Sequence, residues 1–354
     1  MDQFTRALSC PRQSRPVGVK RHEPHLSDQE VNKLSYEFNE MSFEEARKAS
    51  ENTQHWLVEG KIGNTTTLIY GEPKVGKSFI ACALINALLS GGEFLGSAVP
   101  QDRDFSVAVL WTDDGAPSEY QERVDSVWAG TGVPNVRFYE VPVMRSIDMW
   151  RSLFNQVMLN RHNVVVIDNL SQASNGSVNQ DDVAKEFFDG VRLFSRAGIP
   201  VIVIGHSSDK ANANGFKSEL PLGSTYISSA VRWRVFVKRS RAGNLTLRFK
   251  GNVAQEHEVT VKHGAGARFE LIDVKSAEQL QVAAEASERQ RSQQKLDKGL
   301  ADAQWVVANC QQDPSRNQAA TRFAAAHKLS QQAALSRLRR APLDYLNGGW
   351  VLAA

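Results

Sequence analysis

Short apolar segments alternate with longer amphipathic segments between about residue 56 and residue 273. The apolar segments are rich in β-branched residues, which predicts strands, and the segments between them have helical length. Strands that alternate with helices of this length favour a parallel sheet covered on both faces, so the pattern predicts an α/β fold. The predicted strands are residues 65–70, 106–112, 136–141, 163–167 and 199–205, and the predicted helices are residues 77–90, 117–129, 147–161 and 181–197.

The pattern changes after residue 231, where shorter segments predict four more strands. Turn residues join them at Arg241 to Asn244 and at His263 to Gly266, where glycine permits a tight reversal. We therefore expect antiparallel strands at the C-terminal edge of the mainly parallel sheet. These strands are residues 231–238, 244–249, 256–261 and 267–272.

Polar segments flank the α/β region and divide the chain into four predicted parts. Ser42 and Glu45 form a capping box in the polar N-terminal part, which predicts a short helix in an N-terminal arm. Residues 275–300 are rich in Glu, Gln, Ser, Arg and Lys, which indicates a solvated helix or a linker. The predicted parts are an arm at 1–55, the α/β domain at 56–273, a linker at 274–301 and a helical unit at 302–354.

The C-terminal unit has a pattern of its own. Residues 317–327 and 331–340 predict two short helices joined by a tight turn, and the second helix is basic. This spacing suits a helix-turn-helix, and residues 345–352 suit a small β-wing. A helical module that serves structure or docks a protein partner is an equal alternative.

Composition narrows the class of protein. The 354 residues include 42% hydrophobic and 23% charged residues, which is ordinary for a soluble globular chain, and the net charge of +3 neither demands nor excludes nucleic acid. Cys10, Cys82 and Cys310 lie far apart, so we expect neither a disulfide framework nor a cysteine metal site. No apolar run reaches the roughly 20 residues that cross a bilayer. We expect a cytoplasmic protein without a membrane segment.

The strongest motif lies between the first predicted strand and the first predicted helix, where it matches G-x-x-x-x-G-K-[ST] in full. In such a loop, backbone amides and the helix N-terminus surround phosphates. We expect Lys77 to reach the β- and γ-phosphates of ATP, and the hydroxyl of Ser78 to bind Mg²⁺. The residues that line this phosphate site are Gly71, Glu72, Pro73, Lys74, Val75, Gly76, Lys77, Ser78 and the following Phe79.

Carboxylates end two of the predicted strands. Asp168 ends the strand about ninety residues after the phosphate loop, where a Walker B carboxylate holds the magnesium shell. Asp113 and Asp114 end the strand at 106–112, and a carboxylate there can polarise the attacking water. The alternative is that Asp113 and Asp114 cap the next helix.

His206 ends another apolar strand, so its ring is a candidate sensor of the γ-phosphate. A structural histidine is the alternative. The polar segment 207–222 follows it and is long for a connector in a compact domain, which favours a functional or disordered loop. Its lysines, Lys210 and Lys217, are candidate contacts to the backbone of single-stranded DNA.

These motifs, in this order, resemble those of the RecA-like ATPases, and more narrowly those of plasmid RepA-type hexameric replicative helicases. The similarity covers roughly residues 56–255. It is greatest from Val201-Ile-Val-Ile-Gly-His206 through Gly223-Ser224, and then in Ala230-Val-Arg-Trp233. The resemblance implies a RecA-like fold, ATP and Mg²⁺ as ligands, and nucleotide bound between the subunits of a ring.

The resemblance also implies roles for single residues. Arg232 corresponds to an arginine finger that reaches the nucleotide of the neighbouring subunit, and Lys250 to a second basic residue across that interface. Arg123 corresponds to an arginine near the site. Asp113 stands where the family has a catalytic glutamate that is one methylene longer. Three alternatives follow from this departure: the attacking water lies in a different place, hydrolysis is slow, or Asp114 is the catalytic carboxylate.

We therefore expect a homo-oligomeric ATP-dependent helicase that moves on single-stranded DNA in plasmid or phage replication. The resemblance implies a hexameric ring. Replication or recombination proteins are further expected partners. One alternative is a RecA-like ATPase that serves as a recombination mediator or loader and binds duplex DNA. Another is a nucleotide-gated regulator with negligible turnover.

Overall fold

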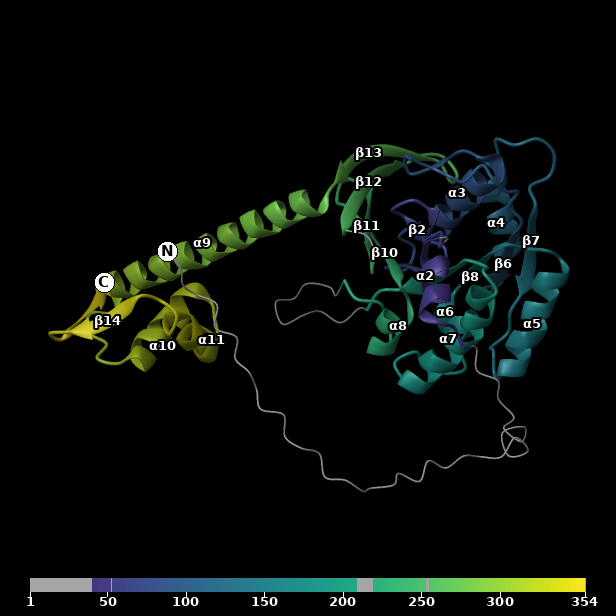
Figure 1. Ribbon diagram of the computed structural model, residues 1–354. Coiled ribbons are helices and arrows are strands. Elements are labelled where there is room, and N and C mark those ends of the chain that lie inside the picture. Colours follow the sequence, from purple (N-terminus) through teal and green to yellow (C-terminus); the bar gives the residue numbers. More distant parts are fainter. Residues whose placement is uncertain (1–39, 52, 209–218, 253–254, 354) are drawn as a thin grey trace, which may run out of the picture. The chain divides into compact units, whose positions relative to one another are not determined.

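The computed structural model describes residues 40–51, 53–208, 219–252 and 255–353 (Figure 1). The chain divides into two compact units, Met1–Thr53 and Gln54–Ala354. In the first unit, helix α2 (Phe43–Glu51) begins at the predicted capping box. The Oγ of Ser42 accepts a hydrogen bond from the amide of Glu45, and the Glu45 carboxylate accepts one from the amide of Ser42, so the predicted short helix is confirmed.

A central sheet organises the second unit and, within the described residues, contains nine strands in the order β13-β12-β11-β10-β3-β9-β8-β6-β7. The strands from β10 through β3 to β7 pair in parallel, and those from β10 to β13 pair antiparallel. The predicted α/β fold is confirmed. The strands are β3 (Thr66–Gly71), β6 (Val107–Trp111), β7 (Val136–Glu140), β8 (Val164–Asp168), β9 (Val201–His206), β10 (Trp233–Arg239), β11 (Leu245–Gly251), β12 (His257–His263) and β13 (Phe269–Lys275).

Strand β10 differs from the prediction. It was expected among antiparallel strands, yet only its pairing with β11 is antiparallel, and it runs parallel to β3 with Val237 opposite Gly71. The end of β10 therefore lies beside the end of β3. This register decides which cations lie near the phosphate loop.

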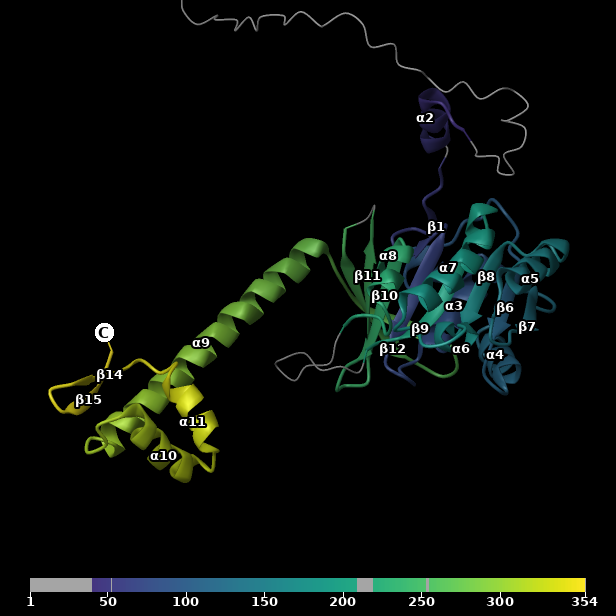
Figure 2. The same cartoon turned by 90° about the horizontal axis from the view of Figure 1, so that it is seen from below.

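Two hydrophobic cores cover the two faces of the sheet, because alternate residues of each strand point to opposite sides. Figure 2 shows the helices that pack around the sheet. One core joins the sheet to α3 and α4, and the other joins it to α5, α7 and α8. The near-continuous apolar strands follow from this double coverage. The helices are α3 (Lys77–Ser90), α4 (Ala116–Asp125), α5 (Ile147–Leu159), α6 (Leu170–Ala173), α7 (Asp181–Arg196) and α8 (Thr225–Ala230).

Two short hairpins escaped prediction because strands of two or three residues are too brief to show a period. They are β1 (Trp56–Val58) with β2 (Ile62–Gly63), and β4 (Glu93–Phe94) with β5 (Ser97–Ala98).

The C-terminal residues form a third hydrophobic core of their own around Phe323 and Trp350. Helix α9 (Ala277–Asn309) occupies the segment predicted as a solvated helix or linker, and it begins with a capping box. The two predicted short helices and the wing hairpin are present. They are α10 (Arg316–His327), α11 (Gln331–Leu338), β14 (Leu343–Leu346) and β15 (Gly349–Leu352). Across the described residues, no helix has both the length and the apolar character to cross a membrane.

Two cysteines lie in separate cores, and both are free thiols. Cys82 belongs to α3, and burial raises its pKa to about 12. Cys310 follows α9, and burial together with a hydrogen bond to Asp313 raises its pKa to about 11. Cys10 lies outside the described residues.

Candidate functional site

The glycine-rich loop connects the end of β3 to the start of α3. Gly76 adopts a φ of 115°, in the left-handed region that glycine tolerates, and it directly precedes the first helical residue. This conformation lets the chain turn at once into α3, so the free amides at the N-terminus of α3 face the loop. Such amides bind anions, above all phosphate groups.

Lys77 lies under this loop and is almost fully buried. Its Nζ donates hydrogen bonds to the carbonyl oxygens of Gly71 at 3.2 Å and Glu72 at 2.8 Å, and lies 3.4 Å from Nδ1 of His206. Burial lowers the pKa of Lys77 to about 8, and the negative charge of Asp168 opposes part of that effect. A polyanionic ligand would compensate the buried ammonium far better than these carbonyl groups do.

Ser78 and Asp168 form the acidic side of the site. The Oγ of Ser78 donates a hydrogen bond of 2.7 Å to Oδ2 of Asp168, and the hydroxyl of Tyr120 donates one of 2.8 Å to the same oxygen. A hydroxyl and a carboxylate held together in this way are the oxygen ligands that Mg²⁺ uses beside phosphates. The residues present therefore fit a magnesium ion, with Ser78 and Asp168 as its protein ligands.

Backbone contacts hold Asp168 in place. The hydroxyl of Thr112 donates a hydrogen bond of 3.1 Å to the carbonyl oxygen of Asp168 and accepts one of 3.0 Å from the amide of Asn169. Thr112 follows β6, the neighbour of β8 in the sheet. Two adjacent strand ends are thus tied together where the acidic residues gather.

Asp113 and Asp114 are now distinguished by position. Asp113 lines the cavity and forms a side-chain hydrogen bond with Gln172, whereas Asp114 does not line it in the described part of the chain. Burial and the nearby charge of Asp168 raise the pKa of Asp113, while the Gln172 hydrogen bond opposes this. A carboxylate with a raised pKa is a better base toward water.

These residues surround a cavity of about 400 Å³, which lies within the size range of small-molecule sites. Arg123 lies 4.3 Å from the ring centroid of Phe79 and forms an ion pair with Glu119, and all three residues line the cavity. The other lining residues are Pro73, Lys74, Gly76, Lys77, Ser78, Asp113, Asp168, Asn169, Gln172, Ile204 and His206.

Three predicted phosphate-loop residues make backbone hydrogen bonds that hold the loop. Gly71 and Glu72 offer their carbonyl oxygens to Lys77, and the carbonyl oxygen of Val75 accepts a hydrogen bond of 3.2 Å from Arg239. Arg239 ends β10 and reaches the loop because β10 runs parallel to β3.

His206 connects the cavity to the segment 207–222. It ends β9 opposite Gly71 in the sheet, and its carbonyl oxygen accepts a hydrogen bond of 2.7 Å from the amide of Leu222. Ser207 and Pro221 form a further bridge, so both ends of the segment are fixed at His206. Lys210 and Lys217, the predicted DNA contacts, lie outside the described residues.

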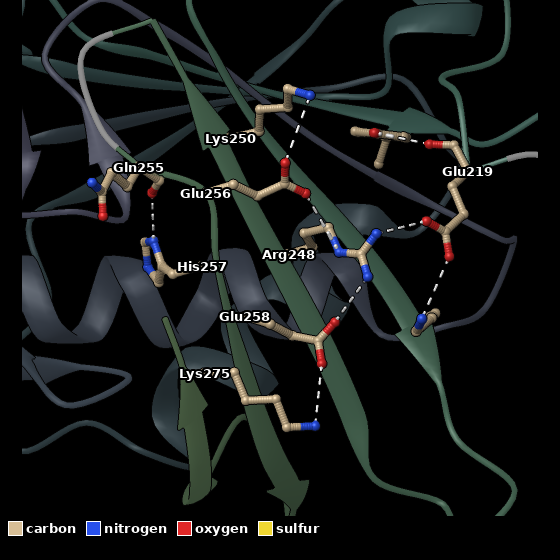
Figure 3. A network of polar contacts seen from close by, with 10 residues as sticks. Glu219, Arg248, Lys250, Gln255, Glu256, His257, Glu258 and Lys275 are labelled. Carbon is tan, nitrogen blue, oxygen red and sulfur yellow. Dashed lines mark hydrogen bonds and ion pairs between the residues drawn. The ribbon is translucent and has the colours of Figure 1, made fainter. Parts of the chain in front are cut away.

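A polar network fixes the returning end of this segment (Figure 3). Glu219 accepts from Arg248 at 3.0 Å and from Lys238 at 3.4 Å, and its carbonyl oxygen accepts a hydrogen bond of 3.0 Å from the Tyr70 hydroxyl. Arg248 also lies 3.4 Å from the carboxylate of Glu258. The segment that starts at His206 is therefore anchored to strands β10 and β11.

Arg232 and Lys250 lie away from the cavity of their own chain. Arg232 precedes β10, whose first residue, Trp233, pairs with Thr67 near the start of β3, and Lys250 pairs with Arg234. The phosphate loop follows the other end of β3, about 13 Å along the strand at about 3.3 Å per residue. Arg232 is exposed and forms no ion pair among the described residues, whereas Lys250 lies 3.7 Å from Glu256.

Trp233 packs tightly at the end of the sheet where β3 begins, next to Arg232. A Cβ atom at Gly63 would lie 1.7 Å from its ring and one at Gly251 would lie 1.8 Å from it, so only glycine fits on either side. Trp56 packs on the same ring with a centroid separation of 4.1 Å. The residue next to Arg232 is consequently tightly packed.

Sequence reasoning missed Tyr120, Thr112, Gln172 and Arg239. None of them belongs to a motif, and their roles depend on which strands are neighbours. The position of Tyr120 one helical turn into α4 gave a weak signal, because Asp113 and Asp114 precede that helix.

The chain matches a known protein family. The sequence profile of a protein family described as an AAA domain matches residues 34–212, which is half of the chain and includes the phosphate loop, Asp113, Asp168 and His206. No curated protein matches the chain.

Proposed function

The chain belongs to the AAA domain family of P-loop ATPases, and from this premise we propose that it forms a ring and couples ATP hydrolysis to movement along single-stranded DNA. One observation carries the coupling. His206 lies 3.4 Å from Nζ of Lys77, and both ends of the segment 207–222 are hydrogen-bonded at His206. A change at the phosphates therefore has a short path to the candidate DNA loop.

The residues divide the chemistry among them. Lys77 and the amides at the start of α3 hold the phosphates, and Ser78 and Asp168 would hold Mg²⁺. When bound, the ion would supply positive charge beside the phosphate oxygens. Asp113 orients the attacking water and accepts its proton, while Gln172 positions the Asp113 carboxylate. Arg123 and Phe79 form the outer wall of the cavity.

Arg232 supports the ring. It is exposed at the edge of the sheet opposite the phosphate loop, so it reaches a nucleotide only in a neighbouring copy of the chain. Repeated head-to-tail contacts of this kind close into a ring. The resemblance to RepA-type helicases supports Arg232 and Lys250 as the residues that act across this interface and supports a role in plasmid or phage replication.

The test is ATP hydrolysis by the purified protein alone, with single-stranded DNA and with duplex DNA, using Lys77→Ala as the blank. We expect single strands to stimulate turnover strongly and the Lys77→Ala variant to lack it. A strand-displacement assay then tests unwinding. Stimulation by duplex alone would favour a DNA-binding loader, and tight ATP binding without turnover under every condition would refute the motor.

A further inference from the structure

The C-terminal unit contains an excess of positive charge. Residues 302–354 contain six Lys and Arg against three Asp, a net charge of +3, so the rest of the chain sums to zero. Charge alone does not define a binding surface, because some of these cations form contacts that stabilise the fold. Their contacts distinguish the cations used inside the unit from those exposed at its surface.

Three arginines are used inside the unit. Arg316 donates a hydrogen bond of 2.6 Å to the carbonyl oxygen of Leu343, Arg322 lies 3.0 Å from Asp313, and Nε of Arg337 donates a bond of 2.8 Å to Asp302. These contacts tie α10, α11, α9 and the hairpin together. They also neutralise two of the three aspartates of the unit.

The other three cations lie in or after the helix-turn-helix and are exposed: Lys328, Arg339 and Arg340. None of them forms an ion pair with another described residue. Arg340 donates only through Nε, to the carbonyl oxygen of Ser336 at 3.1 Å. The surface charge of the unit is therefore concentrated at the turn before α11 and at its C-terminal end.

Helix α11 has one buried face and one polar face. Ala334 and Leu338 lie in the core, whereas Gln332 and Ser336 are exposed and four residues apart, on the side that continues to Arg340. Glutamine and serine hydrogen-bond to base edges in the major groove, and arginine pairs with guanine or phosphate.

The arrangement around α11 fits this use (Figure 1). Helix α10 ends at His327, and Lys328 follows it as the C-cap with a left-handed φ of 53°. Ser330, three residues after His327, caps the N-terminus of α11. The hairpin β14–β15 follows, with positive φ at Asn347 and Gly348 as in a tight two-residue turn. Two helices joined by a short turn, followed by a β-hairpin, present the second helix to a DNA groove.

We propose that the C-terminal unit binds duplex DNA through α11, which enters the major groove. Gln332 and Ser336 face the base edges, and Lys328, Arg339 and Arg340 contact phosphates on either side. This surface is separate from the single-strand contacts of the ATPase cycle. It would hold the enzyme on a duplex region independently of nucleotide.

The test is fluorescence anisotropy with a labelled 30-base-pair hairpin duplex of mixed sequence, using the full-length protein without nucleotide in about 50 mM salt. We expect Arg339→Ala/Arg340→Ala to weaken duplex binding at least ten-fold and to reduce the salt slope by about two, since two phosphate contacts are lost. Ser336→Glu places a negative charge in the middle of the face and gives a comparable loss. Thermal melts confirm folding.

The matched control is Arg137→Ala/Arg151→Ala, which removes two exposed arginines from β7 and α5 and should leave duplex binding unchanged. The proposal is overturned if wild type does not bind the hairpin duplex, or if either α11 variant binds it as tightly as wild type. ATPase stimulation by single strands, measured on the same variants, reports separately on the motor function. A protein-docking role for the unit would give the first of these negative results.

Discussion

The two edges of the central sheet differ in how complete they are. Where β3 ends, Ser78 and Tyr120 both donate hydrogen bonds to Asp168, and Lys77 donates one to the carbonyl oxygen of Gly71. Where β3 begins, Arg232 is exposed beside a tightly packed tryptophan and forms no ion pair among the described residues. One edge therefore carries the phosphate site, and the other carries the exposed guanidinium of Arg232, which has no acidic partner among the described residues.

In the proposed ring, this difference would divide the catalytic apparatus between copies of the chain. A phosphate site that binds but lacks an arginine at the transferred group stabilises the transition state poorly. In the proposed ring, the exposed arginine would supply that group to a neighbouring copy. The variants below are ordered by decreasing expected effect.

The largest effect is expected at the open edge. Arg232→Ala should lower kcat for ATP about a thousand-fold while ATP binding stays near wild type, because an arginine finger acts on the transition state. A mixture of Arg232→Ala and Lys77→Ala proteins should regain activity, since each supplies what the other lacks. Absence of complementation in mixed oligomers, with Arg137→Ala as a fully active control, would show that Arg232 does not act between subunits.

At the edge that carries the phosphate site, substitutions of the two neighbouring aspartates should differ in their effect on kcat. Asp113→Asn should lower kcat about a hundred-fold, the scale of a lost general base, because Asp113 lines the cavity. Asp114→Asn should remain within about two-fold of wild type on the same scale. Steady-state ATPase rates of both variants check this, and the reverse ranking would assign the base to Asp114.

A smaller effect is expected from the buried support of Asp168. Tyr120→Phe removes one hydroxyl that donates to Oδ2 of Asp168 and should raise the Mg²⁺ concentration for half-maximal ATPase about ten-fold, as other outer-shell changes do. Tyr139→Phe is the matched control, because its hydroxyl contacts His162 and not the site. Equal Mg²⁺ dependence in the two variants would remove Tyr120 from the site.

The smallest effect is a pH dependence. The pKa of Lys77 is about 8 in the ligand-free protein, and only the charged ammonium attracts phosphate. Above pH 8 the ammonium of Lys77 in the ligand-free protein loses its proton and must regain it when the nucleotide binds. The Kd for a fluorescent ATP analogue should therefore rise by up to about ten-fold per pH unit. Lys77→Arg keeps its charge and should show a flat profile. A flat profile for wild type would contradict the depressed pKa.

Much of the ATPase core followed from local pattern. The strands β3, β6, β8 and β9 were predictable because both of their faces are buried, and the glycine-rich loop because its spacing is fixed by phosphate geometry. Asp168 and His206 followed from their place at strand ends. In the C-terminal unit, the turn before α11 was visible from Ser330 and the apolar spacing around it.

The rest depended on contacts between distant segments. Alternation identified β10 as a strand but not its neighbour, so the parallel register with β3 and the place of Arg239 beside Val75 were inaccessible. Tyr120 looked like an ordinary core aromatic, since only the approach of α4 to β8 brings its hydroxyl to Asp168. The opposite placement of Arg232 follows from the same strand order.

The two buried thiols can serve as probes of local unfolding in two separate cores. With pKa values near 12 and 11, Cys82 and Cys310 are almost wholly un-ionised at neutral pH and sealed from solvent in separate cores. In a Cys10→Ser background, the rate at which each reacts with a thiol reagent therefore reports how often its own core unfolds. Nucleotide should slow the reaction of Cys82 in α3, and, if the C-terminal unit binds duplex DNA as proposed, duplex should slow that of Cys310 in the core of this unit.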